Sequence, residues 1–274
     1  MPLHGVWPTR TLSRINKGTA MTPSTIAAQL YTLREHTKTP TDIAATLKRV
    51  RRIGYQAVQL SALGKIDPKE LAKILQGEGL TCCATHISLD RMRDEAPAVI
   101  EEHRLWGCSY TAVGGFFPKD PKTQDWLNFA RDYNDIARRY TGSGLAIGYH
   151  NHSHEMAKFD GQRAMDILLA ELDPSIWFEI DTYWIQHGGG DPAAWIKKVA
   201  GRIPCVHLKD MGVTNAREPF MMEVGEGNLN WPEILKACKA AGVRWYIVEQ
   251  DTCYRDPFDS LETSLKNLQQ MDMR

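Results

Sequence analysis

The sequence predicts a single (β/α)8 barrel, an α/β fold, and three observations support this prediction. From residue 26 onward, short apolar runs of strand length alternate eight times with amphipathic segments of helix length. This alternation implies parallel strands, because each helix returns the chain to the same edge of the sheet. The repeats are nearly even in length, and nothing between Ile26 and Met271 resembles an interdomain linker. A closed barrel is therefore favoured over the alternative, an open doubly wound sheet.

The eight predicted strands are short and apolar, and most of them end in a polar residue. They cover Ile26–Tyr31, Ala57–Ser61, Thr81–His86, Tyr110–Gly114, Leu145–His150, Trp177–Asp181, Cys205–Lys209 and Trp245–Glu249. Three helix starts combine an Asp N-cap with a following proline, at Asp67, Asp191 and Asp256. Four helices are expected to end at a glycine that leads into the next strand, at Gly54, Gly79, Gly107 and Gly242.

Composition excludes several classes of protein. Residues 1–24 contain basic side chains but no acid and no apolar segment, so we expect an irregular or disordered leader before a barrel domain over residues 25–274. Lys+Arg and Asp+Glu number 33 each, which argues against a nucleic-acid partner. No apolar run is long enough to cross a bilayer. Six cysteines without paired spacing indicate buried free thiols in a reducing, cytoplasmic compartment.

Metal-binding side chains stand at the carboxyl ends of three consecutive strands, where active sites of such barrels lie. These are Asp181, His207 and Glu249. Each has an ordinary explanation: a helix N-cap for Asp181, a hydrogen-bonded core histidine for His207, and a lysine partner for Glu249. Their equivalent positions on neighbouring strands are better explained by one divalent ion, Mn²⁺, Co²⁺, Mg²⁺ or Zn²⁺, held by nitrogen and oxygen ligands.

Seven stretches of the chain resemble, in order, the sugar phosphate isomerase/epimerase family of xylose isomerase-like TIM barrels. This family also includes inosose dehydratases, ketose 3-epimerases and lyases of 3-keto sugars. The stretches are IAAQLYTLRE, YHNHSHEM, EIDTYW, GGGDP, VHLKDM, EVGEGNLNW and YIVEQD. The resemblance implies one divalent metal held by Glu, Asp, His and Glu from strands five to eight. The last three fall on Asp181, His207 and Glu249, while His150 replaces the first glutamate and becomes the candidate fourth ligand.

The resemblance also implies catalytic roles near the metal. Glu249 is the expected base. His152 and Glu155 could bind sugar hydroxyls or exchange a proton with substrate, whereas His154 is expected at the surface. Lys209 could hold a substrate oxygen or phosphate, or could form an ion pair with Asp210 or Glu226.

Further residues are candidates for substrate contact. His86, Gln29, Tyr31 and Gln59 lie at or near strand ends, and Trp184, Phe116 and Phe117 could form an apolar wall or pack against helices. The segment Asp210–Asn230, with Glu226 in its EVGEG stretch, is expected to cover the substrate. In ketose epimerases of the family a substrate-binding histidine occupies the position of Trp184, so the resemblance argues against ketose 3-epimerisation here.

The expected function is that of a metal-dependent sugar isomerase/epimerase, which removes a proton next to a carbonyl through an enediolate. A lyase or dehydratase acting on a keto-inositol or 3-keto sugar is a close alternative, and a non-catalytic sugar-binding barrel is a further one. Endonuclease IV shares the barrel, but its three-metal site and DNA-binding surface do not suit this neutral chain. We expect a small-molecule, non-phosphorylated sugar or cyclitol as partner, and a homo-oligomer is compatible with the sequence.

Overall fold

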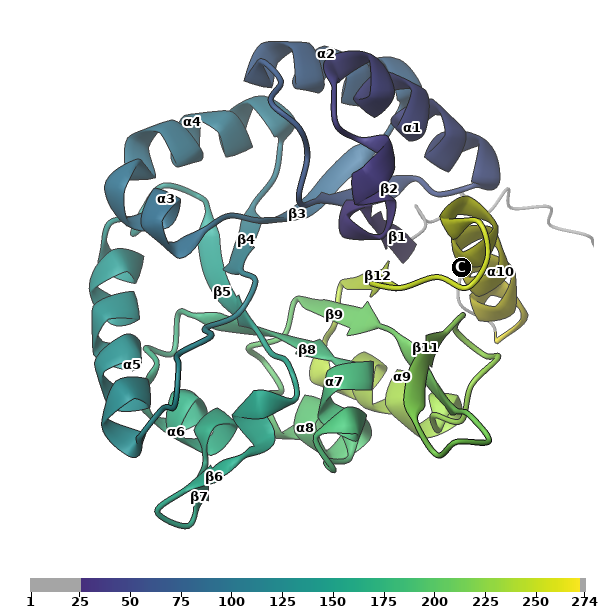
Figure 1. The fold of residues 1–274 in the computed structure, drawn as a ribbon. Coiled ribbons are helices and arrows are strands. Elements are labelled where there is room, and N and C mark those ends of the chain that lie inside the picture. The colour runs from purple at the N-terminus through teal and green to yellow at the C-terminus, as the bar shows by residue number, and fades with distance from the viewer. Residues whose placement is uncertain (1–25, 272–274) are drawn as a thin grey trace, which may run out of the picture.

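A computed structural model describes residues 26–271 and confirms the predicted barrel (Figure 1). Eight parallel strands close on themselves in the order β1–β12–β9–β8–β5–β4–β3–β2. Their bounds are β1 Ile26–Gln29, β2 Ala57–Leu60, β3 Thr81–His86, β4 Tyr110–Val113, β5 Ala146–His150, β8 Trp177–Asp181, β9 Cys205–Leu208 and β12 Trp245–Val248. The prediction for residues 1–24 lies outside the described part of the chain.

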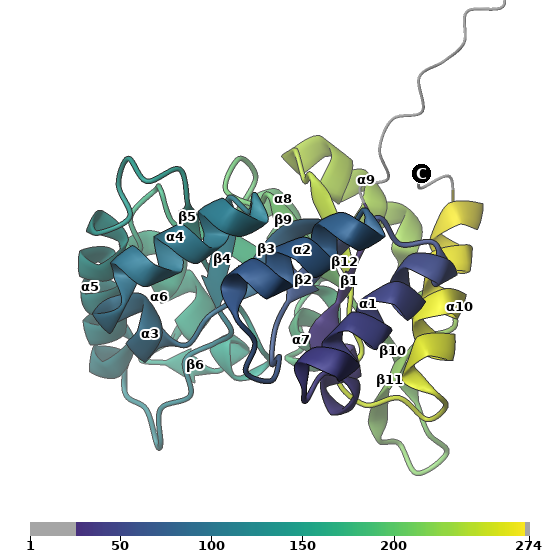
Figure 2. The ribbon, with the colours of Figure 1, turned by 90° about the horizontal axis from the view of Figure 1, so that it is seen from above.

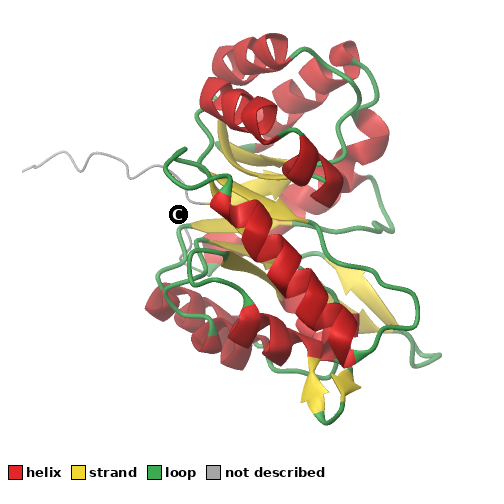
Figure 3. Cartoon of the chain, turned by 90° about the vertical axis from the view of Figure 1, so that its left-hand side faces the viewer, coloured by secondary structure: helices red, strands yellow, loops and turns green. Residues whose placement is uncertain are grey.

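Helices form the outer layer around these strands, as Figures 2 and 3 show from two further sides. The α-helices are α1 Pro40–Ile53, α2 Pro68–Glu78, α3 Leu89–Asp94, α4 Ala96–Trp106, α5 Thr123–Arg138, α6 Ala164–Glu171, α7 Thr182–His187, α8 Pro192–Lys198, α9 Trp231–Ala241 and α10 Pro257–Gln270. Two 3₁₀ helices, η1 Leu30–His36 and η2 His154–Met156, follow β1 and β5. Two hairpins complete the fold: β6 Lys158–Phe159 with β7 Gln162–Arg163, and β10 Asp210–Val213 with β11 Pro219–Met222.

The predicted helix boundaries are confirmed by their caps. Side chains of Asp67, Asp191 and Asp256 accept hydrogen bonds from backbone N–H groups in the first turns of α2, α8 and α10. Gly79, Gly107 and Gly242 end α2, α4 and α9 in the left-handed conformation that glycine adopts without strain. These sharp ends lead the chain directly into the next strand, so the opposite, carboxyl ends of the strands carry the longer loops.

The main hydrophobic core lies between the strands and the helices, and a second apolar cluster fills the interior of the barrel near the amino ends of its strands. Trp177 is the largest side chain of this inner cluster, and Gly148 on the neighbouring strand leaves room for its indole, since a Cβ there would lie 2.4 Å from the ring. All six cysteines are free, as predicted. Within residues 26–271, no helix combines the length and apolarity needed to span a membrane.

Candidate active site

The structure brings the four predicted metal ligands together at the carboxyl ends of the strands. Asp181 ends β8 and pairs in register with His207 of β9, while His150 ends β5 and Glu249 follows β12 directly. All four side chains are buried, and one ligand atom from each lies within 4.8 Å of the others. We call His150, Asp181, His207 and Glu249 the ligand cluster.

Several atoms of the ligand cluster lack the partners that buried polar atoms normally have. Asp181 Oδ2 lies 3.5 Å from His150 Nε2 and 3.7 Å from His207 Nδ1, and His207 Nδ1 lies 2.9 Å from Glu249 Oε2. Nevertheless Asp181 Oδ2, His207 Nδ1 and both ring nitrogens of His150 make no hydrogen bond. Buried polar atoms left in this state are costly. A divalent ion among them would satisfy their lone pairs, so the donor set fits a metal.

A second group behind His207 is already satisfied and holds that ring in place. Gln59 donates through Nε2 to both Glu179 oxygens, at 3.0 and 3.2 Å, so its Oε1 is the atom that lies 2.7 Å from His207 Nε2. Because that oxygen only accepts, His207 Nε2 carries a proton, so Nδ1 is the nitrogen that would present a lone pair to a metal in the ligand cluster. His86 Nε2 closes the group at 2.6 Å from Glu179 Oε2.

Asp181 performs both of the roles considered for it. Its Oδ1 accepts the backbone N–H of Trp184 at 2.9 Å and caps α7, while its Oδ2 points into the ligand cluster. The Asn151 side chain fixes the backbone here by accepting the N–H of Asp181 at 3.0 Å. Helix capping therefore positions this carboxylate for metal binding and does not compete with it.

Lys209 is fully buried beside the ligand cluster. Its Nζ lies 2.9 Å from Asp181 Oδ2, 2.7 Å from Glu249 Oε2 and 3.1 Å from Asp251 Oδ2. The alternative of an ion pair with Asp210 or Glu226 is therefore wrong. The lysine partner considered for Glu249 is present, and it belongs to the same cluster as the proposed ligands.

The site holds more buried negative charge than this one ammonium balances. Burial opposes ionisation of Asp181 and Glu249, but the Lys209 ammonium and the nearby histidines outweigh it and hold the pKa of both carboxyl groups well below their usual range. Burial and repulsion from Glu249 raise the pKa of Asp251 to about 6. Asp181, Glu249 and Glu179 therefore stay ionised near Lys209 and His207, and these carboxylates outweigh burial and raise the pKa of His207 well above its usual range. A further cation stabilises such an excess of buried carboxylates.

A cavity of about 440 Å³ opens over the ligand cluster, and several predicted substrate contacts line it. These are Tyr31, His86, Phe117, His152 and Trp184, together with His150 and Glu249 of the cluster. The rings of His152 and Trp184 lie 5.2 Å apart. Burial, followed by the neighbouring His150, lowers the pKa of His152 to about 2, so its imidazole is neutral at physiological pH.

Glu155 does not face this cavity, contrary to its predicted catalytic role. It has no exposed surface, and its carboxylate accepts hydrogen bonds from the Tyr149 hydroxyl at 2.6 Å and from the His152 backbone N–H at 2.9 Å. Its effect is to hold the loop that carries His152. The prediction that His154 lies at the surface is correct in part. Its side chain is half-buried, and its Nε2 lies 2.7 Å from the Phe116 carbonyl oxygen.

The segment Asp210–Asn230, predicted to cover the substrate, contributes no residue to the lining of the cavity over the ligand cluster. Residues 210–222 form the β10–β11 hairpin, and the following EVGEG stretch wraps around the Asp210 carboxylate, which accepts N–H groups of Gly225, Gly227 and Leu229. Glu226 is exposed and accepts a hydrogen bond from Asn267 of α10. None of these residues lines the cavity over the ligand cluster.

Two other candidates for substrate contact, Gln29 and Phe116, do not line the cavity. Gln29 is fully buried, and its Oε1 accepts the backbone N–H of Tyr31 at 3.3 Å. Phe116 stacks on Phe129 of α5 with ring centroids 4.4 Å apart, which is the helix-packing alternative considered for it. Phe117, by contrast, is 66% exposed at the cavity edge.

Glu179 is the main residue to which the sequence interpretation assigned no role. It lies two positions before Asp181, on the same side of β8, and this spacing was the available signal. Its partners are three side chains from other strands, so its role becomes visible only when the barrel closes. Asn151 and Asp251 were likewise passed over, because their contacts come from loops after the strands.

Comparisons with known proteins agree with this architecture. The family described as "Xylose isomerase-like TIM barrel" matches residues 47–271. The rhizopine catabolism protein MocC of Rhizobium meliloti is 28% identical in an alignment of 165 residues, and the match covers 54% of this chain and 50% of that protein. An inosose dehydratase of Geobacillus kaustophilus is 26% identical in an alignment of 191 residues, and the match covers 60% of this chain and 61% of that enzyme. The matches thus span only part of the length of these curated relatives.

Solved structures share the fold over nearly the whole chain. A sugar phosphate isomerase/epimerase from Parabacteroides distasonis has a TM-score of 0.75 at 24% identity and covers 89% of this chain and 97% of that one. An L-ribulose 3-epimerase has a TM-score of 0.69 at 16% identity, with 89% and 93% covered. At these identities the structures establish the fold alone. With the family match over residues 47–271, they show that the chain belongs to the xylose isomerase-like TIM barrel family.

Proposed function

We propose that this protein removes a proton from the carbon next to the carbonyl of a keto sugar or keto cyclitol, with Glu249 as the base and a divalent metal in the ligand cluster. The observation that carries the proposal is the convergence of buried ligand atoms beneath the cavity, of which both His150 ring nitrogens make no hydrogen bond and Asp181 Oδ2 has only the Lys209 ammonium beside it. When bound, the metal would supply Lewis-acid stabilisation of the negative charge that develops on the carbonyl oxygen.

Within the ligand cluster, Glu249 is the carboxylate best placed to take the proton. Asp181 has no exposed surface, whereas Glu249 is 5% exposed and lines the cavity. Lys209 and His207 hold its Oε2 and keep the carboxylate ionised. A fixed, ionised carboxylate at the cavity floor is suited to general-base catalysis.

Elimination is the outcome that this site favours after proton removal. Glu249 takes the α-proton, the C–H electrons form a carbon–carbon double bond, and a hydroxyl on the next carbon leaves as water with the proton that Glu249 gives back. One carboxylate of the ligand cluster reaches the cavity, because His150 occupies the place of the family's first glutamate and Glu155 faces away. The similarity to inosose dehydratases supports the same choice.

Isomerisation or epimerisation is the second candidate, and His152 favours it. Both reactions return the proton to carbon, and epimerisation needs a proton carrier on the opposite face of the substrate. The neutral His152 ring lines the cavity, and its Nδ1 has no hydrogen-bond partner. With a pKa of about 2 it would not hold an extra proton, but its neutral ring could relay one by giving up a proton from one nitrogen as the other takes one up.

Solvent deuterium exchange tests the proposal. Metal-loaded protein in D₂O should introduce deuterium at the carbon next to the carbonyl of a keto-inositol or 3-keto sugar, as followed by NMR. Glu249→Gln should keep the fold and lower the exchange rate by ~10²–10⁴-fold, the usual contribution of a general base. An unsaturated product would identify elimination, and an epimer would identify the second candidate. If the variant exchanged deuterium as fast as wild-type protein, Glu249 would not be the base.

A further inference from the structure

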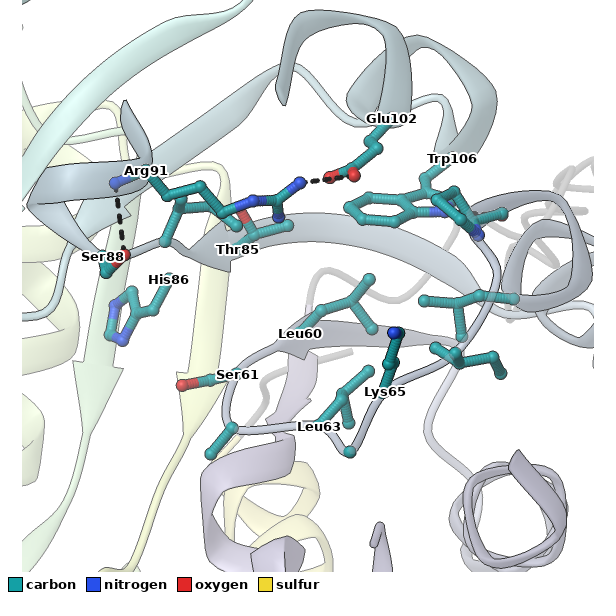
Figure 4. Close-up of a pocket in the computed structure, with 16 residues that line it drawn as sticks. Leu60, Ser61, Leu63, Lys65, Thr85, His86, Ser88, Arg91, Glu102 and Trp106 are labelled. Carbon is teal, nitrogen blue, oxygen red and sulfur yellow. Dashed lines mark hydrogen bonds and ion pairs between the residues drawn. The ribbon is translucent and has the colours of Figure 1, made fainter. Parts of the chain in front are cut away.

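A second cavity of about 550 Å³ adjoins the cavity over the ligand cluster. It lies between the loop after β2 on one side and α3 and α4 on the other (Figure 4). Ser61, His86, Ile87 and Ser88 line both cavities. A molecule seated over the ligand cluster can therefore extend past these shared residues into the second cavity, which we call the side groove.

The side groove is lined mainly by apolar side chains. These are Leu60, Leu63, Ile66, Leu71, Ile87 and Trp106. Figure 4 shows Trp106 and Arg91 on one wall and Leu60, Leu63 and Lys65 on the opposite wall. The polar residues of its lining are Ser61, Lys65, Thr85, His86, Ser88, Arg91 and Glu102. Apolar walls with an indole among them are the usual setting for a hydrophobic or aromatic ring.

One polar feature of the side groove points to a hydrogen-bond donor on that ring. Glu102 of α4 pairs through Oε1 with Arg91, which is also bonded to Glu95 at 3.0 Å. Glu102 Oε2 is buried and has no hydrogen-bond partner. This oxygen is closed to solvent in the free protein, so a ligand hydroxyl in the groove would pair with it after the Glu102 side chain turns, and would then satisfy an acceptor that the protein leaves unpaired.

The groove is held open by its own backbone. Ala62 adopts a left-handed conformation with φ of 54°, and the N–H of Gly64 donates to the Thr37 carbonyl at 2.7 Å. A Cβ on Gly64 would lie 1.9 Å from the Lys38 carbonyl oxygen, so the loop sits as close to η1 as glycine permits. On the other wall, Trp106 Nε1 donates to the Pro68 carbonyl at 3.0 Å. Such a preformed wall reduces the ordering cost of binding.

We propose that the side groove binds an aromatic, hydroxyl-bearing substituent carried by the keto sugar, so that the substrate is an aryl glycoside and not a free sugar. This inference rests on the proposed function, because the sugar ring is placed over the ligand cluster. In a 3-keto glycoside the carbon next to the one that loses its proton carries the aryloxy group, so elimination would release this group as a phenol, with the proton that Glu249 gives back, in place of water. The sugar lies above His150 and Glu249, the glycosidic link passes His86 and Ser61, and the aromatic ring lies between Leu63 and Trp106.

Binding of three matched ligands to the metal-loaded, full-length protein tests this assignment. The 3-keto forms of methyl, phenyl and 4-hydroxyphenyl glucoside share one sugar and differ in the group meant for the groove. Calorimetry should give a phenyl Kd about ten-fold or more below the methyl Kd, in line with the discrimination of apolar pockets. The 4-hydroxyphenyl ligand should bind several-fold tighter again, and Glu102→Gln should weaken that last gain.

A groove-filling variant provides the control. Leu63→Trp should raise the phenyl Kd to the methyl value and leave the methyl Kd unchanged, because Leu63 lies outside the cavity over the ligand cluster. Leu89→Trp, a partly buried leucine outside the side groove, should keep the phenyl preference. Equal Kd values for methyl and phenyl ligands in wild-type protein, or a preference that survives Leu63→Trp, would overturn the assignment.

Deuterium exchange into the methyl ligand separates the two proposals. Exchange without an aryl preference supports the proposed function and rejects the side groove as a substrate site. An aryl preference that Leu63→Trp removes, without exchange, supports the groove and rejects the proposed chemistry.

Discussion

The two ends of the barrel interior differ sharply, although the same strands build both. Near the amino ends the interior is apolar, and its members are Ala27, Ala57, Cys83, Ala84, Ala112, Trp177, Cys205 and Ile247. Two and four residues further along, the inward positions become polar. On β8 the order is Trp177, Glu179 and Asp181, and on β9 it is Cys205, His207 and then Lys209 just beyond the strand.

This difference shows how the strand period separates stability from chemistry. Alternate residues of a strand point to the same side, so each strand adds one interior side chain to each successive layer. The apolar layer stabilises the closed barrel by burying hydrophobic surface. The polar layers above it are costly to bury and are retained where a ligand can satisfy them. Mutations in the two layers should therefore affect different properties.

Trp177→Ala should have the largest effect on stability. Truncating a buried tryptophan costs about 3–5 kcal/mol of unfolding free energy, and Trp177 is only 4% exposed. Urea denaturation followed by circular dichroism would measure the loss. Metal affinity of the folded variant should stay close to the wild-type value, since Asp181 lies ~13 Å further along the strand at 3.3 Å per residue. Equal damage to both properties would mean that the two layers are not separable.

Glu179→Gln should have a smaller effect, and it should act on metal affinity and not on stability. It removes the charge that holds His86 and His207 in place, so metal affinity should fall ~10–100-fold, as is typical for groups that orient metal ligands. Titration with Mn²⁺ would measure this change. Glu155→Gln is the matched control, because Glu155 is equally buried and hydrogen-bonded but faces away from the ligand cluster. Wild-type affinity for Mn²⁺ in both variants would show that Glu179 does not help to hold the metal ligands in place.

The sequence predicted the barrel and the ligand cluster well because both follow from local patterns. Strand length, Asp-Pro helix starts and terminal glycines are read within a few residues, and strand ends locate Asp181, His207 and Glu249. Partners from distant loops were harder to predict. Nothing near Lys209 indicates that Asp251 lies beside it, and the turn that directs Glu155 to Tyr149 depends on η2. The EVGEG stretch was misplaced because Asp210 attracts its backbone N–H groups.

Metal analysis of wild type and Asp181→Ser tests most directly whether the ligand cluster holds a divalent ion. Serine preserves the N-cap of α7 but is too short to reach the cluster, so circular dichroism should show an intact fold. After equilibration with Mn²⁺ and removal of free ion, wild-type protein should retain about one ion per chain, as one ion in the ligand cluster predicts, and the variant should retain almost none. Equal metal content in the two proteins would contradict the assignment of the site.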